Sequence, residues 1–297
     1  MKNILMCDPN ISEGRNSKVI EEITNSIIRT GGIKILEVLP DEDHHRTVYA
    51  YLGEKEDVVQ ATKNMAELAF EMIDMQTHKG DHPRLGALDV VPFIPVGKTE
   101  MPEAVAAAKE FGRFVGDKGI PVYYYEDAAT SPERKNLVNI RKGQYEGLAE
   151  KIEDPRWAPD EGPAEFIPET GAVMIGARIP LVAFNVNLNT TDLSVAKAIA
   201  DALRHSRGGF RYVRAIALRL KEKNQVQVSM NLTNYTRTPP SIVMESIRAQ
   251  AQRYGVNIAG AELVGPVPLA FMEDIMANYL HVHNFSIDQF IETSLID

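Results

Sequence analysis

The chain contains a single cysteine, Cys7, among its 297 residues. An internal disulfide needs two cysteines, and a metal site built from cysteines within one chain needs more than one, so both are excluded. We expect Cys7 to be a small, buried apolar residue, which is the commonest role of a free cysteine.

Long apolar runs and an excess of positive charge are also missing. No stretch of about eighteen uncharged apolar residues occurs, and the start at residues 1–6 is too short for the core of a signal peptide. The formal net charge of -9 repels nucleic acid and anionic membranes. We therefore expect a cytoplasmic protein whose partners include neither nucleic acid nor membranes.

The composition is that of an ordinary globular protein. Apolar residues make up 44% of the chain and charged residues 25%, so a core can form and disorder is not indicated. Domains hold roughly 100 to 200 residues each, so a chain of this length favours two linked units.

The hydrophobic periodicity predicts the same series of elements twice, namely strand, helix, strand, strand, helix and strand. In the first half these elements are expected at 3–8, 16–30, 33–39, 46–52, 58–72 and 88–95, followed by a helix at 101–118 and a strand at 122–125. In the second half they are expected at 181–188, 191–206, 213–220, 225–232, 240–254 and 257–264. Each half is therefore predicted to be an α/β sandwich with its helices on one face of a largely antiparallel sheet.

Residues 150–180 carry too many prolines and glycines for a long helix. These are Pro155, Pro159, Gly162, Pro163, Pro168, Gly171 and Gly176. We interpret this stretch as the linker between the halves, which gives an N-terminal subdomain at 1–179 and a C-terminal subdomain at 180–297. Because long irregular segments are usually functional, we also expect it to line a ligand site.

The second half contains two strands with one apolar and one amide-rich face. The polar positions are Asn185, Asn187, Gln225, Gln227, Ser229 and Asn231. The pattern fits two interpretations equally well: a solvated sheet face, or a polar wall that lines a cleft between the two sheets.

A cluster of imidazoles and cations lies between a predicted helix and a predicted strand. His78 and His82 have the spacing of a helical zinc motif, but Lys79 stands where that motif needs glutamate. Gly80 weakens a helix and Pro83 disfavours the α conformation for His82, so a metal site is disfavoured. His82 is then either a structural histidine or a general acid–base, and spacing alone does not decide between them.

Ordered motifs across nearly the whole chain resemble those of the glutamate formiminotransferases. They read DPNISEGRN at 8–16, RTVY at 46–49, IDM at 73–75, HKGDHPR at 78–84, ALDVVPFIP at 87–95, WAPD at 157–160, GAR at 176–178 and AFNVN at 183–187. The resemblance implies two tandem ferredoxin-like βαββαβ subdomains, a tunnel between them that holds tetrahydrofolate, and a homodimer. It also implies transfer of the formimino group of N-formimino-L-glutamate to N5 of tetrahydrofolate, a step of histidine degradation.

One stretch departs from the family pattern. Leu39 stands where the family has an aspartate, and the following residues at 40–45 read PDEDHH instead of the family's Gly-Pro-Ser-Thr-Asn loop. Either Asp41 or Asp43 supplies the carboxylate, or the donor is different. The second possibility keeps open an N-formyltransferase of the same fold that exchanges formyl between 5-formyltetrahydrofolate and glutamate. A folate-binding protein with a silent site is the third hypothesis. Neighbouring His44 and His45 point apart in an extended segment, which disfavours a metal there.

The resemblance and the chemistry of the substrates together nominate the site residues. The catalytic set is His82 as acid–base, Asn10, Arg46 and Asp41. Guanidinium and ammonium groups suit the two carboxylates of the donor, so its expected ligands are Arg46, Lys79 and Arg84. The folate site is expected at Pro163, Gly171, Ala172, Gly176, Arg178, Asn185, Asn187 and Arg204. Because the chain ends at Asp297, we expect a separate protein to supply the cyclodeaminase that accompanies this domain in bifunctional relatives.

Overall fold

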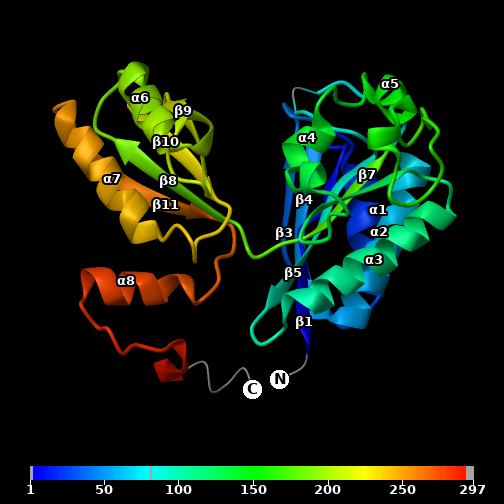
Figure 1. Ribbon diagram of the computed structural model, residues 1–297, viewed down its shortest axis with the longest axis horizontal. Coiled ribbons are helices and arrows are strands. Elements are labelled where there is room, and N and C mark those ends of the chain that lie inside the picture. Colours follow the sequence, from blue (N-terminus) through cyan, green and yellow to red (C-terminus); the bar gives the residue numbers. More distant parts are fainter. Residues whose placement is uncertain (1–2, 81, 292–297) are drawn as a thin grey trace. The chain divides into compact units, whose positions relative to one another are not determined.

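The structure is a computed structural model that describes residues 3–80 and 82–291. The chain divides into two units, Met1–Arg178 and Ile179–Asp297 (Figure 1). Within the described residues, no helix is both long enough and apolar enough to cross a membrane.

The N-terminal unit is built on a seven-stranded sheet. Its strands are β1 (Ile4–Cys7), β2 (Asn10–Ile11), β3 (Ile33–Asp41), β4 (Arg46–Glu54), β5 (Leu88–Val96), β6 (Val122–Glu126) and β7 (Val173–Ala177). Both β1 and β2 pair antiparallel with β4 and β5, so they form two parts of one interrupted strand. β3 pairs with the outer side of β4, while β7 and then β6 extend the sheet in parallel beyond β5.

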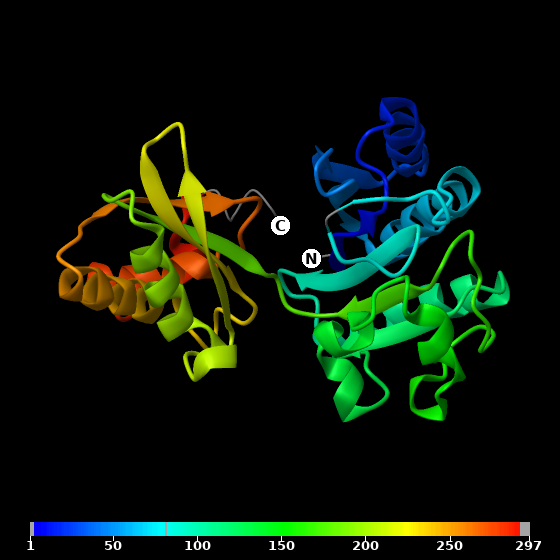
Figure 2. The same cartoon turned by 90° about the horizontal axis from the view of Figure 1, so that it is seen from above.

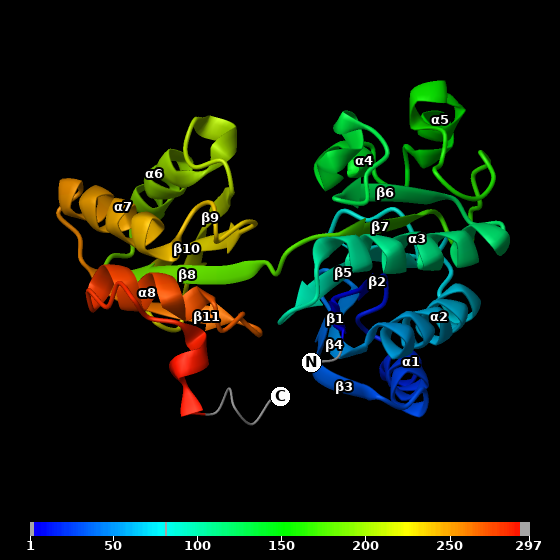
Figure 3. The ribbon, with the colours of Figure 1, turned by 60° about the horizontal axis from the view of Figure 1, so that its bottom comes forward.

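Three long helices cover one face of this sheet (Figure 3). They are α1 (Ser17–Arg29), α2 (Lys55–Met72) and α3 (Met101–Asp117). The side chain of Asn16 caps α1 by accepting from the backbone nitrogens of Lys18 and Val19, and α1 ends before two glycines with positive φ. Cys7 is fully buried in the core beneath the helices, as expected, and burial raises the pKa of its thiol to about 12.

Short elements pack a second apolar cluster against the other face of β6 and β7. They are α4 (Leu137–Arg141) and α5 (Leu148–Glu153), with 3₁₀ turns η1 (Pro132–Lys135) and η2 (Pro155–Trp157). Their side chains Ile140 and Leu148 lie in one cluster with Tyr123 and Met174 of the sheet. This cluster holds in place the segment that carries Arg141, which reaches the site described below.

The interpretation of residues 150–180 as a linker is wrong. Val173–Ala177 forms β7, which is fully buried and runs parallel between β5 and β6 within the N-terminal unit. Such a strand is short, apolar on both faces and paired with distant segments, so it has no alternating pattern to read. The sheet is largely antiparallel, as expected, and only β7 and β6 are added in parallel beyond β5.

The C-terminal unit has a four-stranded antiparallel sheet in the order β11-β8-β10-β9. The strands are β8 (Val182–Leu188), β9 (Val213–Leu220), β10 (Gln225–Leu232) and β11 (Ile258–Val264). The α-helices are α6 (Leu193–Leu203), α7 (Pro240–Arg253) and α8 (Phe271–Tyr279). Two 3₁₀ turns are η3 (His205–Arg207) and η4 (Ile287–Gln289). Helices α6 and α7 lie on one face of the sheet (Figure 2). The predicted repetition of a βαββαβ unit is thereby confirmed.

The amide-rich face of this sheet is internally hydrogen-bonded. Gln227 Nε2 donates to Asn187 Oδ1 at 2.8 Å and to Glu262 Oε1 at 2.6 Å, and Asn185 Oδ1 accepts from the backbone nitrogen of Met230 at 3.2 Å. The amides therefore tie β8, β10 and β11 together.

Candidate active site

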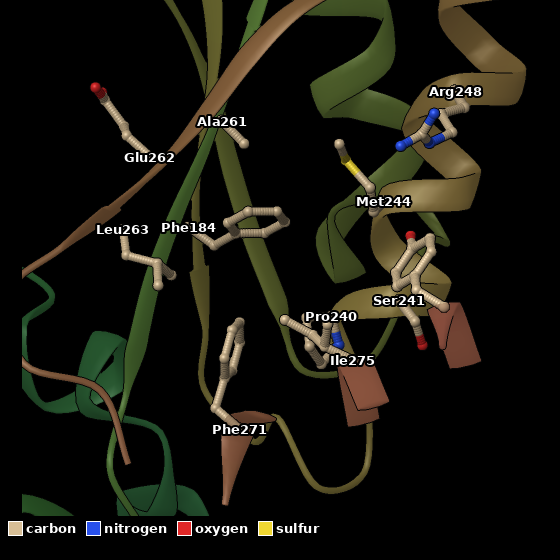
Figure 4. Close-up of a pocket in the computed structure, with 11 residues that line it drawn as sticks. Phe184, Pro240, Ser241, Met244, Arg248, Ala261, Glu262, Leu263, Phe271 and Ile275 are labelled. Carbon is tan, nitrogen blue, oxygen red and sulfur yellow. The ribbon is translucent and has the colours of Figure 1, made fainter. Parts of the chain in front are cut away.

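The C-terminal unit contains an apolar cavity of about 470 Å³ between α7, α8 and strands β8 and β11 (Figure 4). Phe184, Met244, Phe271 and Ile275 dominate its wall, with Arg248 at α7. No histidine among the described residues lines it. The candidate acid–base residue His82 lies in the N-terminal unit.

A small cavity in the N-terminal unit gathers polar side chains from β2, the turn between β3 and β4, the loop after α2 and the start of β5. Its lining residues are Asn10, Ile11, Ser12, His44, His45, Arg46, His78, His82, Arg84 and Asp89. Of the residues nominated from sequence, Asn10, Arg46, His82 and Arg84 meet here.

Two glycines allow the loops around this cavity to pack closely. A Cβ at Gly14 would lie 2.2 Å from the carbonyl oxygen of Asp41 and 2.7 Å from the backbone nitrogen of Arg46. A Cβ at Gly80 would lie 2.5 Å from the carbonyl oxygen of His44. Any larger residue would push the β3–β4 turn away, so both positions require glycine to keep that turn at the cavity.

His82 is held by Arg46 in a defined protonation state. Arg46 Nη1 lies 2.7 Å from His82 Nε2. A guanidinium has only donors, so Nε2 must accept, and the neutral ring carries its proton on Nδ1. Burial lowers the pKa of His82 to about 3, and the positive charges of Arg46 and Arg141 act in the same direction. His82 is therefore neutral when no substrate is bound.

Arg46 stands at the first position of β4 and has unused donor capacity. Its Nη1 also lies 3.4 Å from Asn10 Oδ1, while its buried Nε has no hydrogen-bond partner in the described part of the chain. Leaving a buried donor unpaired costs about 1–3 kcal/mol. An anionic ligand at this guanidinium would remove that cost.

Arg141, which the sequence analysis did not nominate, lies beside the cavity and contacts its lining residue Asp89. Its Nη2 lies 2.7 Å from Oδ2 of Asp89, whose Oδ1 accepts from the backbone nitrogen of Leu85 at 2.6 Å. Burial raises the pKa of Asp89, whereas the adjacent Arg141 opposes the rise. The buried Nε of Arg141 also lacks a described partner. Arg141 lies on a five-residue helix, which is too short to give a periodic signal in the sequence.

The other two cationic nominees for the donor are differently placed. Nη1 and Nη2 of Arg84 donate to Glu146 at 3.0 and 2.7 Å, and Nε donates to His78 Nδ1 at 3.1 Å. The two Nη atoms of Arg84 are thus already hydrogen-bonded to a protein carboxylate. Lys79 is exposed and does not line the cavity, although its carbonyl oxygen accepts from Arg15 Nη1 at 3.2 Å. Donor binding by Arg84 and Lys79 stays a prediction.

Within residues 39–45, where a departure from the family pattern was expected, His44 and His45 line the cavity. Leu39 pairs with Val48 in the sheet and is about half exposed. Asp41, at the end of β3, accepts from the backbone nitrogen of His44 at 2.9 Å, and its Oδ2 lies 2.6 Å from His44 Nδ1. The rings of His44 and His82 lie nearly perpendicular to each other, with centroids 6.0 Å apart. The Asp41 carboxylate therefore reaches the site through His44.

Three of the residues nominated for folate are buried packing positions. Gly171 has φ +65, and a Cβ there would lie 2.1 Å from the carbonyl oxygen of Leu85. Ala172 is fully buried, and a Cβ at Gly176 would lie 2.5 Å from the ring of Tyr125. These residues shape β7 and its approach to β5, and a role in folate binding stays a prediction for them.

The remaining folate nominees lie in different parts of the two units. Pro163 is half-buried in the loop before β7, and Arg178 Nη2 lies 2.9 Å from Asp8 Oδ2. In the C-terminal unit, Arg204 pairs with Asp201 at the end of α6. Folate binding by these residues, and by the two asparagines of β8, likewise stays a prediction.

Two further histidines near the cavity contact each other. The rings of His45 and His78 stack with centroids 4.4 Å apart, and His78 Nε2 lies 2.9 Å from the carbonyl oxygen of His45. Among the described residues, no group of three or more histidine, cysteine or acidic side chains is arranged to hold a metal ion.

The state of His82 can be measured directly. We expect its ring to stay neutral from about pH 8 down to about pH 5 in the unliganded protein, whereas an unperturbed histidine titrates near 6.5. Replacing Arg46 with alanine removes one of the opposing charges, so the pKa of His82 should rise. Nitrogen-resolved NMR of the imidazoles measures both. Titration of His82 near pH 6.5 in the parent protein would contradict the geometry.

Comparisons with known proteins match both units. A model of the "Formiminotransferase domain, N-terminal subdomain" matches residues 4–178, and a model of the "Formiminotransferase domain" matches residues 183–296. The chain is 39% identical to a glutamate formimidoyltransferase of Streptococcus pyogenes serotype M1 over all of both chains. It is 41% identical to a protein of the same name from Thermoplasma acidophilum, over 99% of this chain and 97% of that one. It is also 41% identical to a formimidoyltransferase-cyclodeaminase of Sus scrofa, covering 96% of this chain and 54% of the longer protein.

Proposed function

The chain belongs to the formiminotransferase family, and on that basis we propose that it is a folate-dependent transferase that moves the formimino group of N-formimino-L-glutamate to N5 of tetrahydrofolate. This reaction is a step in the degradation of histidine to glutamate. The observation that carries the proposal is the full-length likeness to glutamate formimidoyltransferases. The contact between His82 and Arg46 supports it chemically.

The reaction needs two proton movements. N5 attacks the formimino carbon and must lose its proton, while the bond from that carbon to the glutamate nitrogen breaks and that nitrogen must gain a proton. We assign acid–base catalysis to His82, since an imidazole with an ordinary pKa accepts and donates protons near neutrality and donor binding, described next, would return the pKa of His82 toward that value. A neutral His82 with a lone pair on Nε2 is in the state that accepts the proton from N5.

Binding of the donor would change the surroundings of His82. The donor carries two carboxylates, and guanidinium groups match carboxylates in shape and charge. A carboxylate at Arg46 would fill its unpaired donor, draw the guanidinium from His82 Nε2 and neutralise the charge that lowers the pKa of His82. His82 would thus become a stronger base only when the donor is present. We propose Asn10 as the third member of this catalytic set with His82 and Arg46, because its Oδ1 lies beside the Arg46 guanidinium.

Replacing Arg46 with alanine is therefore expected to raise the KM for the donor. A hydrogen bond to a charged group contributes about 1.5–3 kcal/mol, which corresponds to roughly a tenfold to more than a hundredfold change. Arg156→Ala is the matched control, because Arg156 is exposed and its guanidinium pairs only with nearby Asp154 among its described contacts. An unchanged donor KM in Arg46→Ala would refute the proposed contact.

Tetrahydrofolate enters this proposal as the second substrate. We retain Pro163, Gly171, Ala172, Gly176, Arg178, Asn185, Asn187 and Arg204 as its proposed surroundings. We also propose that residues 1–179 and 180–297 act as N- and C-terminal subdomains, and that the protein works as a cytoplasmic homodimer.

The choice of donor is the point that an assay must test. The loop at 39–45 is the main support for the alternative, formyl exchange between 5-formyltetrahydrofolate and glutamate, because its residues differ from the family pattern. We expect rapid turnover, followed by folate absorbance, with N-formimino-L-glutamate and tetrahydrofolate. Faster turnover with 5-formyltetrahydrofolate and glutamate would support the alternative. Folate binding without turnover on either pair would indicate a silent site.

A further inference from the structure

Two imidazoles in the cavity of the N-terminal unit have opposite electrostatic surroundings. His82 accepts from a guanidinium at Nε2 and lies near a second guanidinium, so a positive charge on its ring is disfavoured. His44 lies beside a carboxylate, with its Nδ1 2.6 Å from Asp41 Oδ2, and the two form an ion pair when the ring is protonated. Groups that share a site but have opposed surroundings are suited to opposite halves of acid–base catalysis.

The contacts of His44 orient its ring. The Asp41 carboxylate accepts from both the backbone nitrogen and Nδ1 of His44, which fixes the side chain against the end of β3. Nδ1 is then the donor to Asp41, which leaves Nε2 as the ring nitrogen available to a ligand. A histidine oriented by a carboxylate in this way is a recurrent arrangement in proton transfer. His44 lines the same cavity as His82, at a ring-centroid distance of 6.0 Å.

We propose that His44, oriented by Asp41, is the general acid that protonates the departing glutamate nitrogen, while His82 takes the proton from N5. The bond from N5 to the formimino carbon forms, the bond from that carbon to the glutamate nitrogen breaks, and one proton leaves N5 as another reaches glutamate. Exchange with solvent then returns the proton from His82 and reprotonates His44, so the cycle is balanced. The inference rests on the proposed formimino transfer and gives a role to the loop in which this chain departs from the family pattern.

The test uses His44→Ala, Asp41→Asn and the control His283→Ala, whose histidine is exposed in the C-terminal unit. Positioned proton transfer typically contributes about 10²- to 10⁴-fold. We expect His44→Ala to lose turnover within that range, with tetrahydrofolate affinity kept, and added imidazole to restore part of the rate. Asp41→Asn should lose less, because it keeps the ring but not the negative charge. His283→Ala should match the parent.

Three results would each count against His44 as the general acid. Turnover of His44→Ala within a few-fold of the parent would overturn the assignment. A large loss that imidazole does not restore, in a variant with the parent's melting temperature and circular dichroism, would also overturn it by reducing His44 to a positioning role. If the parent enzyme itself fails to transfer the formimino group while binding folate, the proposed function falls and the assignment falls with it.

Discussion

Replacing His82 with alanine should lower kcat for formimino transfer by about 10²- to 10⁴-fold. In the proposed mechanism His82 is the base that removes the proton from N5. Its Nε2 carries no proton, because it accepts a hydrogen bond from Arg46. Alanine offers no acceptor, so N5 would have to lose its proton to solvent. Steady-state kinetics with N-formimino-L-glutamate and tetrahydrofolate measure the loss.

The affinity for folate distinguishes a chemical role of His82 from a structural one. Because His82 is assigned to proton transfer, His82→Ala should bind tetrahydrofolate about as well as the parent and should retain its melting temperature. The exposed His283→Ala variant again serves as the control for removal of an imidazole. Turnover of His82→Ala within a few-fold of the parent would mean that another group is the base.

Local sequence patterns predicted the regular part of the fold well. The strands Val213–Leu220 and Gln225–Leu232 were predicted residue for residue, because side chains of a half-buried strand alternate between an apolar and a polar environment. β7 was missed since its Val173–Ala177 segment is buried on both faces and pairs in parallel with distant strands. The information that places β7 lies in its partners and not in its own pattern.

The candidate site shows a similar division. The family resemblance nominated Asn10, Arg46 and His82, which the fold brings to one cavity although they lie in separate segments. Resemblance could not supply the contacts that set their chemistry. The neutral state of His82 depends on the position of Arg46 Nη1, and the link between Asp41 and the cavity depends on the turn that holds His44. Both are consequences of tertiary packing.

The ion pair between Arg141 and Asp89 shows how the fold supports this site. The Asp89 side chain is 3% exposed and that of Arg141 18% exposed, at 2.7 Å. Removing one partner of a buried pair typically costs about 3–5 kcal/mol, because the remaining charge has no compensation. Native proteins are stable by only about 5–15 kcal/mol. We therefore expect Arg141→Ala to lose a large part of its free energy of unfolding at neutral pH.

The pH dependence of that loss tests its cause. Burial already raises the folded-state pKa of Asp89, and removing Arg141 should raise it further. A carboxyl whose folded pKa exceeds its unfolded value stabilises the fold when protonated, and this contribution is lost as pH rises through the folded pKa. The difference in unfolding free energy between parent and Arg141→Ala should thus be largest at neutral pH and shrink as pH falls.

A double variant separates the charge of Asp89 from its hydrogen bond. In Asp89→Asn with Arg141→Ala, the neutral amide can still accept from the backbone nitrogen of Leu85, but no carboxylate is left uncompensated. Denaturant unfolding at neutral pH should therefore find the double variant more stable than Arg141→Ala alone, since coupled sites are not additive. If Arg141→Ala lowers the free energy of unfolding by less than about 1 kcal/mol at every pH, the pair contributes no more than an exposed ion pair does. The support that it gives to the cavity would then have to come from the packing of Ile140 and Leu148 against β6 and β7.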